Sequence, residues 1–256
     1  TLVETSMLDE GQNNFIASIC PEGEQYGLAV ADISTGEIHA AQFTDPDDST
    51  LKNELSRFAP NEIVFHPAFL DKKEMAEFIR NRLSCCAECL RGAQSGFSEA
   101  QRRVLEQFGK SDLSELSLDQ RPLAVQAIGG LLDYLTETQM NGVDRLVSLD
   151  LYSESQFMAL DLTARRNLEL TETMRTGEKK GTLLWVLDRT RTAMGKRLIR
   201  QYVEQPLLSP AVIGRRLDAV DELYQDTILR DTVRERLGGI YDMERLMTKI
   251  VFGNCT

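Results

Sequence analysis

The sequence has few of the side chains that most often carry out catalysis. It contains two histidines, His39 and His66, one tryptophan and no Gly-x-Ser-x-Gly motif, so a serine or cysteine triad has little support. A phosphate loop of the form GxxxxGKS or GxxxxGKT is also missing, and the loop from Gly177 to Gly181 has the wrong spacing to replace it. We therefore name no catalytic and no cofactor-binding residue.

Long apolar runs are missing as well. No stretch approaches the length that spans a bilayer, and the N-terminus shows no basic-then-apolar leader. The cysteines are odd in number, which without a leader suggests a reducing compartment. They are Cys20, Cys85, Cys86, Cys89 and Cys255. We expect a cytoplasmic protein without membrane association.

A metal site is not expected either. Cys86 and Cys89 have the spacing of half a zinc site, but no second such pair follows, and both histidines are distant in sequence. A structural zinc ion needs four ligands. The sequence supplies two at the right spacing.

Charge is unevenly distributed over a chain of otherwise ordinary composition. The 256 residues are 42% hydrophobic and 27% charged, which is typical of a soluble globular protein and long enough for two domains. The net charge is −11, yet residues 165–216 hold twelve Lys or Arg against five Asp or Glu. This basic part could lie near DNA, or its charges could be solvated helix faces that offset an acidic neighbour.

The first half predicts an α/β domain. Three runs rich in apolar and β-branched residues, at 15–20, 26–32 and 37–43, are separated by hairpin-scale gaps and predict an antiparallel meander. Helices are expected from about Ser49, after Asp71, from Ser98 and from Pro122, with Ser49, Asp71 and Ser98 as N-caps. Short strands are expected at 62–65 and 86–90. This order indicates a mixed sheet of the ribonuclease-H-like type.

The second half predicts mostly helices. Asp161 or Thr163 is expected to cap a first helix, and Thr190 or Thr192 a second one that Pro206 stops. Pro210 then opens a helix in the first-turn position, and two more are expected at about 228–237 and 243–250. The helix after Pro210 carries one apolar stripe. Its members are Ile213, Leu217, Val220 and Tyr224.

Several blocks of this half resemble a known family. Asp188-Arg-Thr, Thr192-Ala-Met-Gly-Lys-Arg-Leu, Gln205-Pro-Leu and Arg216-Leu-Asp-Ala-Val-Asp-Glu-Leu resemble the start of the core, or lever, domain of the MutS family of DNA mismatch-recognition ATPases. Asp161 with the block from Thr163 to Leu170, and Asp242-Met-Glu-Arg-Leu, extend this resemblance. The run from Tyr26 to Gly36 resembles a strand of the connector domain of the same family.

The resemblance implies a domain organisation. We expect a leading segment at 1–12, a connector domain at 13–138, a linker at 139–150 and a truncated core domain at 151–256. It also implies that the chain is a piece of a bacterial mismatch repair protein, which couples an ATPase to mismatch-binding and clamp domains that this sequence does not contain. The lever helices are then expected to leave part of their apolar stripe exposed.

The resemblance also implies partners for the full-length protein. It is expected to be a homodimeric, DNA-dependent ATPase that binds mismatched double-stranded DNA, with ATP and magnesium in the ATPase domain. The MutL partner is expected to dock on the helix from Ser98 to Phe108. The residues implied for its outer face are Gln101, Arg102, Arg103 and Glu106.

Two other functions remain open from the residues alone. One is a metal-dependent nuclease centred on Asp32, with Glu62 and either Glu99 or Glu106 as further carboxylates, because phosphoryl transfer uses carboxylates to hold metal ions. The competing interpretation, which we favour, is that Asp32 caps the turn from Ser34 to Gly36. The other function is an adaptor whose only activity is protein binding.

Overall fold

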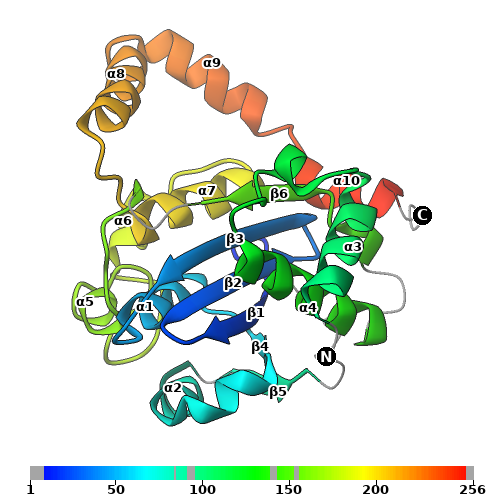
Figure 1. Cartoon of the computed structure of the whole chain (residues 1–256). Helices are drawn as coiled ribbons and strands as arrows, with labels where there is room; N and C mark the ends of the chain where they lie inside the picture. Colours follow the sequence, from blue (N-terminus) through cyan, green and yellow to red (C-terminus); the bar gives the residue numbers. More distant parts are fainter. Residues whose placement is uncertain (1–8, 84, 91–95, 139–142, 153–155, 252–256) are drawn as a thin grey trace. The chain divides into compact units, whose positions relative to one another are not determined.

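The computed structural model describes residues 9–83, 85–90, 96–138, 143–152 and 156–251. The chain divides into two compact units, drawn in Figure 1. The first is formed chiefly by residues 14–153, and the second by residues 9–13 and 154–249. No helix in the described ranges has the length and hydropathy of a membrane span.

The first unit is built on a six-stranded mixed sheet with the order β5-β4-β1-β2-β3-β6. β1, β2 and β3 form the predicted antiparallel meander, β4 and β5 continue it in parallel beside β1, and β6 pairs in parallel with β3. The strands are β1 Phe15–Glu22, β2 Gln25–Asp32, β3 Glu37–Thr44, β4 Glu62–Phe65, β5 Cys86–Cys89 and β6 Ser148–Leu151. The mixed α/β sheet is thus confirmed. β6 falls across the range expected to be linker, where no strand was predicted.

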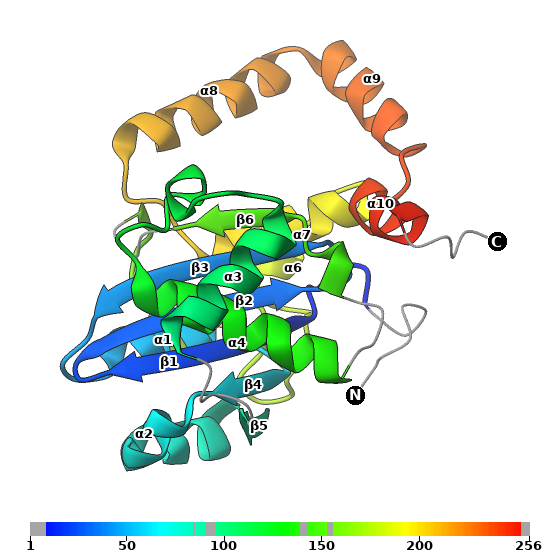
Figure 2. The ribbon, with the colours of Figure 1, turned by 45° about the vertical axis from the view of Figure 1, so that its right-hand side comes forward.

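Helices cover both faces of this sheet, as Figure 2 shows. On one face α3 and α4 pack against alternate residues of the central strands, such as Ile16, Ala29 and Ile38. On the other face α1 and the segment around α2 pack against Ala17, Leu28 and others. The helices are α1 Ser49–Phe58, α2 Lys73–Phe78, α3 Phe97–Phe108 and α4 Pro122–Thr138, with helical turns at Pro67–Asp71, Ile79–Leu83, Leu113–Leu116 and Val143–Arg145. Because both faces are covered, β2 is buried along almost its whole length.

The start of α4 lies directly on β2. A Cβ atom at Gly27 would lie 2.0 Å from the carbonyl oxygen of Leu123, so only glycine lets the helix approach this closely. Gln42 on β3 completes the contact, because its side-chain Oε1 accepts a hydrogen bond from the Leu123 backbone N–H at 2.9 Å. The sheet itself therefore caps α4.

Three predicted helix caps of this unit are wrong, although their helices exist. The N-cap of α1 is Asp48, and the carboxylate of Asp45 binds the backbone N–H groups of the first turn at 2.8 and 3.1 Å. α2 begins after Lys72 and α3 after Gly96, both without a side-chain cap. More than one polar residue precedes each helix, and packing on the sheet selects where the helix begins.

The second unit is helical, as predicted. Its helices are α5 Leu162–Asn167, α6 Leu183–Leu187, α7 Ala193–Glu204, α8 Pro210–Gln225, α9 Thr227–Leu237 and α10 Met243–Val251. Asp161 caps α5 and Thr192 caps α7, each within the predicted alternatives. α7 ends two residues before Pro206, as expected. The short helix α6 was not predicted, and the predicted cap at Gly253 and Asn254 lies outside the described residues.

The predicted exposure of the apolar stripe is confirmed. Leu217, Val220 and Tyr224 of α8 are 61, 62 and 71% exposed, and Ile228 of α9 is 80% exposed. The small core of this unit lies elsewhere, around Leu170, Leu184 and Val203.

Candidate functional site

The outer face of α3 carries the predicted partner-binding residues. Arg102 is exposed and held between two acids of its own helix, since its guanidinium donates to Glu99 and, at 2.6 Å, to Glu106 Oε1. The hydrogen bond from Arg102 lowers the pKa of Glu99. Gln101 is half-buried. On this face one guanidinium is therefore shared by two carboxylates, which leaves a net charge of −1.

Arg103 points in a different direction from Arg102. Its Nε and a terminal nitrogen both reach Asp133 Oδ1 of α4 at 2.7 Å, and its side chain is 31% exposed. Successive residues of an α-helix point about 100° apart, so Arg103 does not share the direction of Arg102. Its ion pair with Asp133 connects α3 to α4. Arg102 and Glu106 lie together on the exposed face.

Asp32 has the environment of a turn cap. Its Oδ1 accepts from the backbone N–H of Ser34 at 2.8 Å and from the Ser34 hydroxyl at 2.6 Å, while Oδ2 accepts from Asn14 N–H at 3.1 Å. Glu62, proposed as its companion, lies against the Tyr134 hydroxyl instead. The turn interpretation is confirmed, and nothing supports the nuclease alternative.

The cysteine pair of β5 belongs to no ligand cluster in the part of the chain that the structure describes. Cys86 is exposed and Cys89 is half-buried, and both are free thiols. Among the residues that the structure describes, no three His, Cys, Asp or Glu side chains are placed to hold a metal ion.

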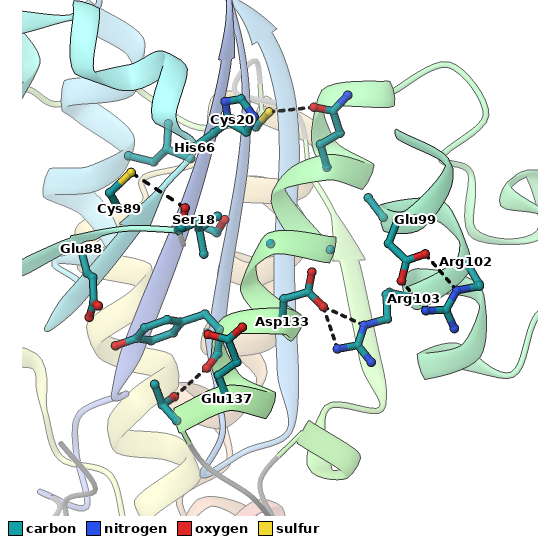
Figure 3. A pocket seen from close by; sticks show the side chains of 18 residues that line it. Ser18, Cys20, His66, Glu88, Cys89, Glu99, Arg102, Arg103, Asp133 and Glu137 are labelled. Atoms are coloured by element: carbon teal, nitrogen blue, oxygen red, sulfur yellow. Dashed lines mark hydrogen bonds and ion pairs between the residues drawn. The ribbon is translucent and has the colours of Figure 1, made fainter. Parts of the chain in front are cut away.

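A cavity of about 570 Å³ lies between α3, α4 and the β1–β4–β5 side of the sheet. Figure 3 shows Ser18 of β1 in its wall, between Glu88 on one side and the paired Asp133 and Arg103 on the other. At one end the Cys20 thiol donates to Gln126 Oε1 at 3.1 Å, and burial raises the pKa of Cys20 to about 11. Sequence reasoning missed this cavity, because its walls come from five separate segments.

The second unit contains a cluster of ion pairs around a buried arginine, which we call the Arg197 hub. Arg197 of α7 is 6% exposed and binds both carboxylate oxygens of Asp242 at 2.8 Å, and Glu244 at 2.5 Å. It also donates to the backbone carbonyl of Glu10 at 3.2 Å. Arg245 of α10 donates to the backbone carbonyls of Asp9 and Gln12. The hub thus joins α7, α10 and residues 9–13.

The hub was not predicted, although the sequence held a signal for it. Arg197 lies in the Thr192 block and Asp242 in the last block of the family resemblance. Arg197 on α7 and Asp242, which immediately precedes α10, lie 45 positions apart, so no helical spacing in the sequence would pair them.

Comparisons with known proteins match both units to one family. The model described as MutS domain II matches residues 14–150, and the one described as MutS domain III matches residues 163–256. The chain is 38% identical over 258 residues to the DNA mismatch repair protein MutS of Ruminiclostridium cellulolyticum, which covers 100% of this chain. The corresponding protein of Synechococcus elongatus is 41% identical over 255 residues and covers 96% of the chain. The chain spans 29% of the length of each of these relatives.

Proposed function

This chain belongs to the MutS family of DNA mismatch repair proteins, and we propose that it acts as the non-catalytic connector and first lever segment of such a protein. The observation that carries the proposal is that the two family domains follow each other in the same order as the two units of the structure. The proposed role is mechanical: to pass the state of an ATPase to a DNA-binding part.

The Arg197 hub gives this role a physical basis. A buried, bidentate guanidinium–carboxylate pair fixes both distance and orientation. α7, α10 and residues 9–13 are therefore expected to move as one body. Because Asn13 immediately precedes Asn14 and β1 in the chain, any displacement of this body also displaces the peptide that leads into the sheet.

The activities of the whole protein belong to the same proposal. We expect a cytoplasmic homodimer that binds mismatched double-stranded DNA and hydrolyses ATP with magnesium in a separate domain. The relatives' printed name, DNA mismatch repair protein MutS, supports the repair role.

A chimera tests this function. The chain would replace the matching segment of the Ruminiclostridium cellulolyticum protein, and ATP hydrolysis stimulated by mismatched DNA would be measured. We expect the chimera to keep this stimulation, whereas a chimera with Arg197→Met should lose most of it and still bind ATP. A control chimera with Arg215→Met, an exposed position on α8, should behave as the unmodified chimera does. Equal stimulation in all three would contradict the proposed relay.

The chain alone provides the test of the nuclease alternative. We expect neither ATP hydrolysis nor magnesium-dependent cleavage of DNA or RNA. Cleavage that Asp32→Asn abolished would replace the mechanical role with the nuclease.

We also propose that α3 docks the MutL partner through Gln101, Arg102, Arg103 and Glu106. Arg102→Glu together with Arg103→Glu should weaken binding of MutL to the chimera without changing its affinity for mismatched DNA. Because Arg103 also binds Asp133, Arg102→Glu alone is the cleaner variant, and Arg215→Glu is the matched charge control. Unchanged MutL affinity in the Arg102→Glu variant would remove this docking surface.

A further inference from the structure

A short main-chain pairing ties the entry of the second unit to the loop between α7 and α8. Phe157 and Leu207 form an isolated antiparallel bridge, flanked by two backbone hydrogen bonds of 2.8 and 3.3 Å. We call the paired residues 156–158 and 206–208 the elbow strap. It connects the place where the chain enters the second unit from the first with the place where it turns into α8.

The strap holds the residues about which α8 can turn. Proline fixes its own φ, so Pro206 and Pro210 add no freedom to the loop. Ser209 precedes a proline and is restricted as well. The remaining loop residues between the two prolines are Leu207, which lies in the bridge, and Leu208, which donates one of its hydrogen bonds. The closed strap therefore fixes the turn from α7 into α8.

The other contacts that hold α8 are few. No residue of α8 or α9, both described in full, is buried. A cation–π contact joins α8 to α7, with the Arg216 guanidinium 3.6 Å from the centre of the Tyr202 ring. The strap itself lies at the surface, because Met158 and Leu208 are 47 and 50% exposed. Exposed backbone hydrogen bonds outside a ladder open locally at low free energy, so the strap can open while the rest of the unit stays folded.

We propose that the elbow strap is a releasable catch for α8. Closed, it fixes the angle between α7 and α8; open, it lets Leu207 and Leu208 rotate and α8 swing. Because residues 156–158 follow the first unit in the chain, a displacement of that unit acts directly on the catch. The strap deepens the proposed mechanical role and rests on it, as a second route that does not pass through the Arg197 hub.

Hydrogen exchange of the chain, followed by NMR, tests whether the strap opens. The Met158 N–H donates to the carbonyl oxygen of Pro206 and the Leu208 N–H to that of Gln156, so a single opening exposes both amides. After correction for local sequence, their rates should agree within about twofold and exceed those at the centre of α7. Rates that differ from each other, or that are as slow as those of α7, would overturn the proposal.

A pair of arginine variants tests whether this opening moves α8. Because α8 cannot swing while the Arg216 contact holds, Arg216→Met should speed exchange at both strap amides about two- to fivefold, the factor that a surface cation–π contact is worth. Arg215→Met, at the neighbouring exposed position, should leave both rates unchanged. Equal rates in the two variants would mean that α8 stays in place when the strap opens, which would overturn its role as a catch.

Phe157→Cys with Leu207→Cys makes a strap that can be locked. Directly opposite residues in a pair of this kind have Cα atoms about 4.5 Å apart, which a disulfide spans. Oxidation with glutathione disulfide should form the bond, as seen by peptide mass spectrometry, and slow both strap amides about tenfold or more. Dithiothreitol should reverse this effect. A bond that does not form in the folded chain would show that the strap is not paired and would overturn the proposal.

The locked strap also separates the catch from the proposed function. In the chimera with the Ruminiclostridium cellulolyticum protein, locking should remove most of the ATP hydrolysis stimulated by mismatched DNA, and reduction should restore it. The unmodified chimera, oxidised in the same way, is the control. Unchanged stimulation with the strap locked would overturn the catch. An unmodified chimera without any stimulation would instead contradict the proposed function, and the exchange rates of the chain would still decide whether the strap opens.

Discussion

Arg197 and Asp242 form a bidentate ion pair, with two nitrogen–oxygen distances of 2.8 Å between α7 and the start of α10. The arginine side chain is 5% exposed and the aspartate 18%, so the pair is largely shielded from water. Removing Arg197 leaves Asp242 with only the longer contact to Arg245, at 3.9 Å, in surroundings where a poorly paired charge is costly. The stability of the second unit is therefore expected to depend on this pair.

Replacing the arginine should destabilise the second unit strongly. Arg197→Met keeps most of the side-chain length but removes the charge, and the expected loss is about 3–5 kcal/mol, as for other broken buried pairs. Urea unfolding followed by circular dichroism measures this loss. The control Arg215→Met, exposed on α8, should change the unfolding free energy by less than about 0.5 kcal/mol. Equal effects of the two substitutions would show that the hub is not a stabilising feature.

The same pair predicts a dependence of stability on pH. Burial acts to raise the pKa of Asp242, but the hydrogen bonds from Arg197 and from the Arg245 backbone outweigh it, and the pKa lies below its usual value. A carboxylate with a depressed pKa stabilises the fold above its unfolded pKa of about 4 and loses this effect as the pH falls through the folded pKa. Unfolding midpoints between pH 7 and pH 2 should therefore fall less steeply in Asp242→Asn than in the unmodified chain.

Alanine substitution at Gly27 and at Gly214 should have opposite effects on stability. Gly27→Ala places a Cβ 2.0 Å from the Leu123 carbonyl oxygen, a backbone atom that cannot turn away, and should cost about 3 kcal/mol. At Gly214, inside α8, an added Cβ has nothing within 4 Å, and alanine should stabilise the helix by about 1 kcal/mol. Thermal unfolding of both variants should show shifts of opposite sign. A tolerated Gly27→Ala would mean that α4 does not lie this close to β2.

The thiols should differ widely in reactivity. Burial raises the pKa of Cys20 to about 11, so almost none of it is thiolate at pH 8, whereas Cys86 is exposed on the edge strand β5. Timed labelling with iodoacetamide in a Cys255→Ser background, read by peptide mass spectrometry, should modify Cys86 first and Cys20 last. Fast labelling of Cys20 would show that the cavity beside it opens more widely than this structure implies.

The exposed stripe of α8 and α9 should cause self-association. Leu217, Val220 and Tyr224 follow one another at helical spacing on α8, Ile228 follows on α9, and all four are exposed; exposed apolar surfaces of this kind mark sites of association. Leu217→Lys with Val220→Lys should shift the sedimentation of the chain toward the monomer at concentrations where the unmodified chain associates. The unfolding free energy should change little, because both side chains are already exposed. A purely monomeric unmodified chain would contradict this expectation.

Much of the fold could be predicted because its signals are local. The runs around β1 to β3 are short, apolar and separated by turn residues, and α7 and α8 carry a regular period between a capping threonine and two prolines. The predicted N-caps at Ser49, Asp71 and Ser98 were wrong because several polar residues precede each helix. Asp45, which binds the first turn of α1, reaches it from five and six positions away.

The candidate sites were less predictable because the contacts that form them join residues far apart in the sequence. Arg102 and Glu106 could be placed on one exposed face of α3 from helical spacing, but the pairing of Arg103 with Asp133 depends on how α3 packs on α4. Cys20, Gln126 and Ser18 meet in one cavity only after β1 is placed beneath α4. Contacts between residues more than 100 positions apart leave no spacing in the sequence.

The amino-acid sequence alone determined the order of the elements, the turn role of Asp32 as the favoured interpretation, and the resemblance that led to the MutS family. Only the tertiary structure decided that β6 joins the sheet, that Arg197 is buried against Asp242, and that Ser18 lines a cavity. Periodicity and turn chemistry act over a few residues, so they can be recognised directly in the sequence. Burial and ion pairing depend on which distant surfaces come together, and these appear only when the chain has folded.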